Sequence, residues 1–241
     1  MGFYYTMNQS PFASITPVVK NLLIINVLFF IGSYVLERAG INLDVLLSAF
    51  YFNSPLFRPW QVVTYMFMHA NFAHIFFNMF ALFMFGPTLE YVMGPKRFLQ
   101  YYFITGIGAL ALQMLVQAIE VHGVIGSFTV ANRDIGPYVN YAGFNKLKEI
   151  YYGITLGASG SIFGLLLAFG FLFPNVEMMV LFIPVPIKAK YLIGGYIVLE
   201  LIGGFGQFAG DSVAHFAHLG GALFGFLLLK YWRMQRPDNF Y

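Results

Sequence analysis

The chain has 241 residues, of which 59% are hydrophobic, 20% aromatic and 10% charged, and its mean hydropathy is +0.71. A soluble globule of this size would leave much of that apolar surface in water, so the composition indicates a protein that crosses a membrane several times. The net charge of +3 comes from basic residues scattered between apolar runs, which argues against a nucleic-acid surface. The absence of cysteine excludes disulfides and thiolate chemistry, so serine and histidine remain as candidate reactive groups.

Six apolar segments divide the chain, each close to the roughly 20 residues that a helix needs to cross a bilayer. We therefore predict an all-α bundle of six transmembrane helices, with residues 1–241 forming a single domain. An aromatic stretch at 42–57 lies between the first two helices and is predicted to rest at the membrane interface. Residues 121–149 are polar and glycine-rich, which predicts an external loop. The predicted helices span residues 18–36, 60–85, 97–119, 152–173, 187–206 and 212–231.

The basic residues predict how the bundle is oriented. If the N-terminus is cytoplasmic, eight of the 13 basic residues fall on the inner side and the rest lie in longer external loops. The positive-inside rule therefore favours an arrangement with both termini inside. The inner set comprises Lys20, Lys96, Arg97, Lys188, Lys190, Lys230, Arg233 and Arg236.

A serine in a glycine-rich motif opens the fourth segment. Ser159 lies between Gly157 and Gly160, and Gly164 continues the spacing i, i+3, i+7 along one helical face. Such a face of small residues lets transmembrane helices approach closely, which by itself would explain the glycines. A close approach would also bring a second helix near the serine hydroxyl, so a packing role and a catalytic role are compatible.

The sixth segment repeats this spacing with a histidine. His218 shares a helical face with Gly221 and Gly225, so its imidazole points along a second glycine seam. If the two seams meet, His218 can accept the proton of Ser159 and activate the hydroxyl as a nucleophile. His215 lies one turn earlier and is the competing candidate, although it does not begin the glycine spacing.

The second segment supplies a third polar cluster, formed by His69, His74 and Asn78. His74 and Asn78 are four residues apart, so their side chains project together and could donate hydrogen bonds to an oxyanion. A histidine that merely satisfies its hydrogen bonds between helices is the alternative, but the cost of burying polar groups in lipid disfavours it for a whole cluster. No buried acid is obviously placed to complete a triad, which leaves a Ser-His dyad.

Five motifs occur in order along the chain: Arg58-Pro59-Trp60, His69, His74-x-x-x-Asn78, Gly157-x-Ser159-Gly160 and Ala217-His218-x-x-Gly221-x-x-x-Gly225. Together they resemble the rhomboid intramembrane serine proteases, over essentially the whole six-helix core. The resemblance implies that Ser159 is the nucleophile and His218 the base. It also implies that His74, Asn78 and the Ser159 backbone amide form an oxyanion hole. Glu90 resembles the structural acid of the family.

One position departs from the family pattern. Phe163 stands where a tyrosine often stacks on the catalytic histidine, so stacking is expected here without a hydroxyl. By resemblance, the fifth helix and the loop 205–211 would form a gate and a cap.

The resemblance implies hydrolysis of single-pass transmembrane proteins within the lipid bilayer, without a cofactor, a metal or nucleic acid. The compactness of the chain suggests a bacterial inner membrane. A non-catalytic rhomboid-like protein that binds transmembrane segments is the alternative. A metal or haem protein using His69, His74, His215 and His218 is disfavoured, because buried carboxylates are scarce and no His-Glu-x-x-His motif is present.

Overall fold

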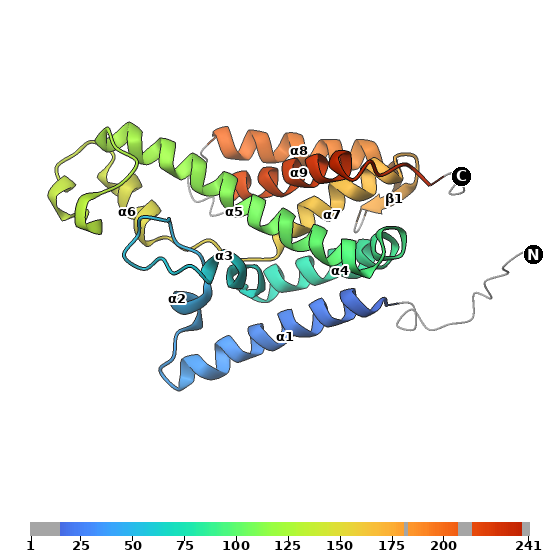
Figure 1. Ribbon diagram of the computed structural model, residues 1–241, viewed down its shortest axis with the longest axis horizontal. Helices are drawn as coiled ribbons and strands as arrows, with labels where there is room; N and C mark the ends of the chain where they lie inside the picture. Colours follow the sequence, from blue (N-terminus) through green and yellow to red (C-terminus); the bar gives the residue numbers. More distant parts are fainter. Residues whose placement is uncertain (1–14, 181–182, 207–213, 238–241) are drawn as a thin grey trace, which may run out of the picture.

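The computed structural model describes residues 15–180, 183–206 and 214–237, and it is an elongated bundle of helices that lie side by side (Figure 1). Its long helices are α1 (Pro17–Arg38), α4 (Phe72–Met93), α5 (Pro95–Ile125), α7 (Ser159–Leu172), α8 (Ala189–Gly206) and α9 (His215–Tyr231). The shorter elements are α2 (Leu43–Leu47), α3 (Gln61–Thr64), α6 (Phe144–Tyr152), the 3-10 turns Tyr65–Phe67, Ala131–Arg133 and Gly136–Tyr138, and the strands β1 (Glu177–Val180) and β2 (Ile183–Lys188).

Four helices, α1, α4, α5 and α8, are long and apolar enough to span a membrane, so the chain is an integral multi-pass membrane protein. α7 has 14 residues and would reach only about 21 Å along its axis. The fourth segment was predicted to start at residue 152, but residues 153–158 are non-helical and α7 begins at Ser159. α7 therefore begins inside the bundle rather than at its end, and Ser159 is its first residue.

The second predicted segment is also shifted along the chain. Residues 60–67 form α3 and a 3-10 turn, and the backbone is extended at Met68, so the long helix α4 begins only at Phe72. Asn71 caps that start, because its side chain accepts a hydrogen bond from the backbone N–H of His74 at 2.9 Å. This cap fixes the position of His74 in the first turn of α4.

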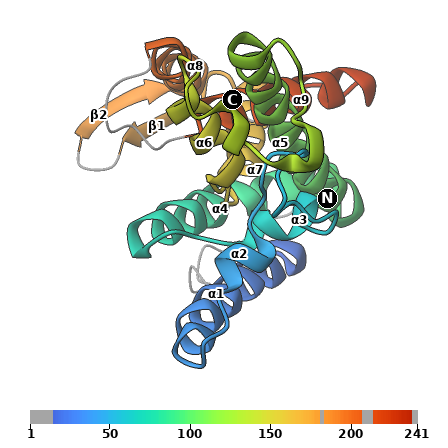
Figure 2. The ribbon, with the colours of Figure 1, turned by 90° about the vertical axis from the view of Figure 1, so that its left-hand side faces the viewer.

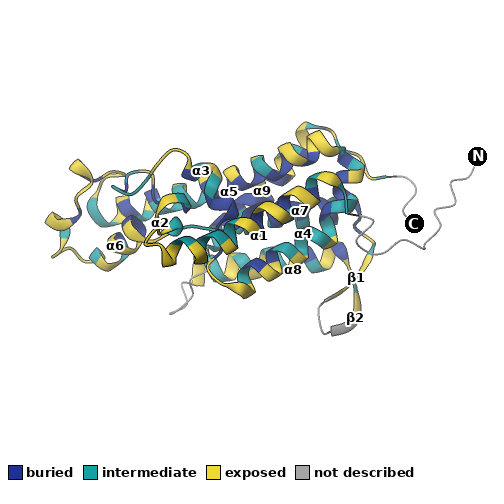
Figure 3. Cartoon of the chain, turned by 90° about the horizontal axis from the view of Figure 1, so that it is seen from below, coloured by how far each residue is buried: buried dark blue, intermediate teal, exposed yellow. Residues whose placement is uncertain are grey.

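α7 forms the centre of the bundle and contacts α4, α5, α8 and α9. Seen along the bundle, α1 and α8 lie on opposite sides of this central group (Figure 2). Exposed residues lie mainly along α1 and α8, and buried residues lie mainly on the interior helices (Figure 3). Within the most apolar stretch of each helix, 39% of the residues of α5 are buried, but only 11% of those of α8. α8 is thus the most loosely packed of the four spanning candidates.

α1 is anchored to α4 by a carboxylate. Glu90 accepts hydrogen bonds from the backbone N–H groups of Val18 and Val19, at 3.1 and 2.9 Å, and from the Thr16 hydroxyl. The first N–H groups of a helix have no partner within it, so Glu90 satisfies donors that would otherwise be buried without one. Its role in the structure is that of an inter-helix cap.

The start of α1 and the end of α9 lie at the same end of the bundle, and α2, α3 and α6 lie at the other (Figure 1). Residues 121–149, predicted as a loop, are largely ordered at this second end. α5 continues to Ile125, and α6 packs back on it around the buried side chains of Val121, Leu147 and Tyr151. The apolar residues of α6 recur at helical spacing, which explains why this polar stretch folds.

A hairpin corrects the all-α prediction. β1 and β2 pair antiparallel, with Glu177 opposite Lys188, and α8 starts directly afterwards at Ala189 rather than at residue 187. Pro184 and Pro186 lie in β2, where proline excludes a helix but is tolerated in a short two-stranded ribbon.

Candidate active site

Ser159 is the first residue of α7, and the turn before it depends on glycine. Gly157 has φ of +124°, a conformation that residues with a side chain rarely adopt. A Cβ at Gly157 would also come within 2.8 Å of the His74 ring. The backbone N–H of Gly157 donates to the carbonyl oxygen of Tyr65 at 2.9 Å, so the turn is tied to the segment before α4.

The serine hydroxyl and the histidine of α9 are in contact. His218 Nε2 lies 2.8 Å from Ser159 Oγ, which is hydrogen-bond distance. Phe163, one turn after the serine, stacks on the imidazole with ring centroids 4.3 Å apart and planes at 7°. The side chain of His218 is only 12% exposed, so hydroxyl, imidazole and phenyl ring form one packed unit.

The glycine seams meet, as the sequence predicts. A Cβ on Gly221 would overlap the carbonyl group of Gly160, and one on Gly225 would lie 3.3 Å from the Cα of Gly164. The backbones of α7 and α9 therefore touch directly, without intervening side chains. This contact sets the distance between Ser159 and His218.

Candidate donors for an oxyanion lie near the serine. Ser159 is the first residue of α7, so its backbone N–H has no partner within the helix. This N–H lies at the positive end of the helix dipole, where it can donate to a negatively charged oxygen. His74 adjoins Gly157, and Asn78 follows one turn later on α4. Asn78 is 6% exposed, and its Nδ2 has no hydrogen-bond partner among the described residues. A buried amide donor of this kind is available to an incoming oxygen.

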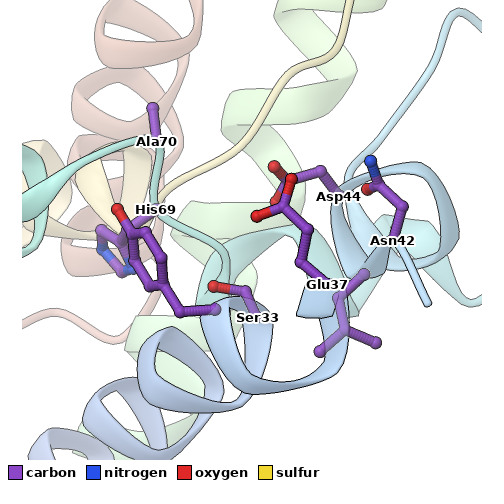
Figure 4. A pocket seen from close by; sticks show the side chains of 8 residues that line it. Ser33, Glu37, Asn42, Asp44, His69 and Ala70 are labelled. Carbon is purple, nitrogen blue, oxygen red and sulfur yellow. The ribbon is translucent and has the colours of Figure 1, made fainter. Parts of the chain in front are cut away.

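His69 packs against His74 at this cluster. It is 4% exposed and packs edge-on against His74, with ring centroids 5.0 Å apart. It also borders a small pocket that is lined by Ser33, Glu37 and Asp44 (Figure 4). His69 therefore contacts the His74 ring, and no interaction recorded among the described residues joins it to Ser159 or His218.

An acid that the sequence analysis missed adjoins the histidine. Glu200 of α8 places Oε1 2.9 Å from His218 Nδ1 and Oε2 2.6 Å from His215 Nδ1. In the sequence no buried acid is obviously placed to complete a triad, but the structure brings Glu200, with its side chain 14% exposed, to both histidines. An ionisable residue within a predicted membrane span is the signal that could have identified it.

The histidines do not converge on a metal centre. Among residues 15–180, 183–206 and 214–237, no group of three or more histidine or acidic side chains is arranged to hold a metal ion. Most of the loop predicted as a cap, residues 207–211, lies outside the described residues.

Comparison with known proteins agrees with the geometry. Residues 57–235 match the family model of the rhomboid domain, so the chain belongs to the rhomboid family. It is 30% identical over 240 residues to the putative rhomboid protease YdcA of Bacillus subtilis (strain 168), a match that covers 94% of each chain. It is 29% identical to the rhomboid protease AarA of Providencia stuartii, over 70% of this chain and 54% of that protein. With the mitochondrial rhomboid protein 1 of Saccharomyces cerevisiae it shares 27% identity, over 67% of this chain and 38% of that protein.

Proposed function

We propose that the protein is an intramembrane serine endopeptidase that cleaves single-pass transmembrane proteins with a Ser159–His218 dyad. The observation that carries the proposal is the 2.8 Å contact between Ser159 Oγ and His218 Nε2 at the start of α7. Membership of the rhomboid family and the names of the bacterial relatives, which are called rhomboid proteases, support it.

In this mechanism, Ser159 Oγ attacks the scissile carbonyl carbon while its proton passes to His218 Nε2. The oxyanion accepts hydrogen bonds from the Ser159 backbone amide, His74 and Asn78. His218 then returns the proton to the leaving amine, and water hydrolyses the acyl-enzyme by the same steps. Phe163 restricts the imidazole to the plane that points Nε2 at the hydroxyl.

The proposed topology has six spans, formed by the six long helices, with both termini in the cytoplasm. Two observations support it. The start of α1 and the end of α9 lie at the same end of the bundle. Eight of the 13 basic residues fall on the inner side in this arrangement, as the positive-inside rule requires. α7 starts from the opposite, external side, so cleavage takes place in the external half of the membrane. The match to the Bacillus subtilis protein over nearly the whole chain supports a bacterial cell membrane.

Labelling with a fluorophosphonate probe tests the proposal directly. The full-length protein in detergent is expected to react, and Ser159→Ala is expected to abolish both labelling and cleavage of a model transmembrane substrate. His218→Ala should be equally inactive, whereas His215→Ala should keep substantial activity because His218 is the histidine that lies 2.8 Å from Ser159 Oγ. Failure of the parent protein to react or cleave would favour a non-catalytic protein that binds transmembrane segments. The reverse ranking of the two histidines would move the base to His215.

A further inference from the structure

α8 carries a single carboxylate, Glu200, and its other charged residue, Lys190, lies at the start of the helix. Leu199 and Leu201 on either side of Glu200 are 62% and 40% exposed, but the side chain of Glu200 is only 14% exposed. The helix therefore presents its leucines outward and its acid toward α9. A carboxylate at membrane depth costs several kcal/mol unless it is hydrogen-bonded or paired. Its position thus depends on the groups it meets.

Those groups are two imidazoles, one for each oxygen. Glu200 Oε1 faces Nδ1 of His218 and Oε2 faces Nδ1 of His215. His218 turns its other ring nitrogen, Nε2, to Ser159. A continuous line therefore runs from the hydroxyl through the imidazole to the carboxylate, and it joins α7, α9 and α8.

The line determines which nitrogen of His218 carries the proton. A neutral imidazole is a donor at one nitrogen and an acceptor at the other, and the partner of one nitrogen fixes the role of the other. A carboxylate only accepts, so it favours the proton on Nδ1 and leaves the lone pair of Nε2 for the serine proton. In this structure Nδ1 of His218 lies 2.9 Å from Oε1 of Glu200, but the angle at Nδ1 does not meet that of a hydrogen bond. Catalytic hydrogen bonds commonly tighten from such an arrangement when substrate binds.

We propose that Glu200 is a positioning residue that extends the Ser159–His218 dyad into a Ser-His-Glu triad. This inference rests on the proposed protease function. Glu200 holds the Nδ1–H tautomer of His218 before reaction and stabilises the imidazolium after Ser159 has given up its proton. The carboxylate stays ionised throughout, and the proton moves only between Ser159 Oγ, His218 Nε2 and the leaving amine. His215 Nδ1 occupies the second oxygen.

Glu200→Gln tests the role of the charge, because it keeps the size of the side chain. Activity is measured on the full-length protein in liposomes with a model transmembrane substrate. The rates are divided by the amount of folded protein, which is measured by size-exclusion chromatography. We expect kcat to fall by roughly 10²-fold or more with KM within about threefold of the parent, and probe labelling of Ser159 to slow in parallel. Glu200→Asp, which keeps the charge but shortens its reach, should fall between the parent and Glu200→Gln.

Glu120→Gln is the matched control, because Glu120 lies on α5 and pairs with Lys146 of α6 at 3.4 Å. It should keep the kcat of the parent. A Glu200→Gln enzyme with kcat within about threefold of the parent would overturn the triad. If that variant gives no folded protein, Glu200→Asp decides: reduced kcat at unchanged KM supports the triad and parental kcat overturns it. An inactive parent would instead refute the proposed protease function.

Discussion

Asn78 offers the most direct test of the oxyanion hole at the scale of a single residue. Its buried Nδ2 has no partner among the described residues, so Asn78→Ala removes a donor without breaking a hydrogen bond that the fold uses. We expect kcat to fall roughly 10²- to 10³-fold, as is usual when one oxyanion donor is lost, with little change in thermal stability. Cleavage kinetics and thermal unfolding of the same preparation provide the measurements.

Met79→Ala, the neighbouring substitution on α4, serves as a control because Met79 packs against the apolar core rather than the serine. It should lower stability, by about 2–5 kcal/mol if the site cannot relax, more than it lowers kcat per folded molecule. An Asn78→Ala enzyme that turns over substrate at the parental rate would remove Asn78 from the oxyanion hole.

The residues of the site differ in how far the sequence could identify them. Ser159 and His218 each begin or precede a run of glycines at helical spacing, and this local pattern fixes the face on which each side chain lies. Glu200 has no such pattern, because its segment is apolar on every side and the sequence does not show which face meets α9. Its partners His215 and His218 belong to the next predicted segment, and the sequence pattern does not show how the two segments face each other.

At the scale of elements, the contact between α7 and α9 determines the geometry of the dyad. Gly221→Ala would place a methyl group against the Gly160 carbonyl, so the helices must move apart. We expect a loss of about 1–3 kcal/mol in the free energy of unfolding, typical of overpacking, and loss of most of the activity because His218 shares this helix. Denaturant unfolding in mild detergent and substrate cleavage measure the two effects.

Gly32→Ala is the matched control, because a Cβ at Gly32 meets nothing within 4 Å. In the middle of α1, alanine should leave activity intact and stabilise the helix by up to about 1 kcal/mol. Full activity in Gly221→Ala would show that the seam does not control the distance between serine and histidine.

Element boundaries were predicted less well than element existence. Hydropathy locates apolar segments but does not distinguish a spanning helix from short turns that are also apolar, which is why α4 begins 12 residues after the predicted start at residue 60. The true start is marked by the Asn71 cap, a signal in the sequence that hydropathy ignores. The β1–β2 hairpin likewise depends on prolines within an apolar run.

At the scale of the whole molecule, contacts between segments far apart in the chain hold together the end of the bundle where α2, α3 and α6 lie. There Tyr51 and Tyr151 pack together with ring centroids 5.4 Å apart, and the Tyr151 hydroxyl donates to Asn53 Oδ1 at 2.6 Å. Burial raises the pKa of both phenols. These contacts join the segment after α1 to α6, so the two segments form one structured unit at this end of the bundle.

The same end holds a partly buried acid, Asp44, whose titration makes stability depend on pH. Burial, and secondarily the charge of Glu37, raises the pKa of Asp44 above its ordinary value of 3.8; Figure 4 shows the two carboxylates side by side. The folded state therefore binds a proton at Asp44 more readily than the unfolded state does. Its contribution to stability is complete below the unfolded pKa and is lost as the pH rises through the folded pKa.

Asp44→Asn removes this titration, so the melting temperature of the variant relative to the parent should rise between about pH 4 and pH 7. Glu37→Gln should act in the same direction but less, because burial is the larger cause and remains. Thermal unfolding in detergent across this range, with the exposed Glu177→Gln as a control that shifts neither way, provides the measurement. A difference between parent and Asp44→Asn that does not change with pH would show that Asp44 titrates alike in the folded and unfolded chains, and the junction of α1 and α2 would then hold no electrostatic strain.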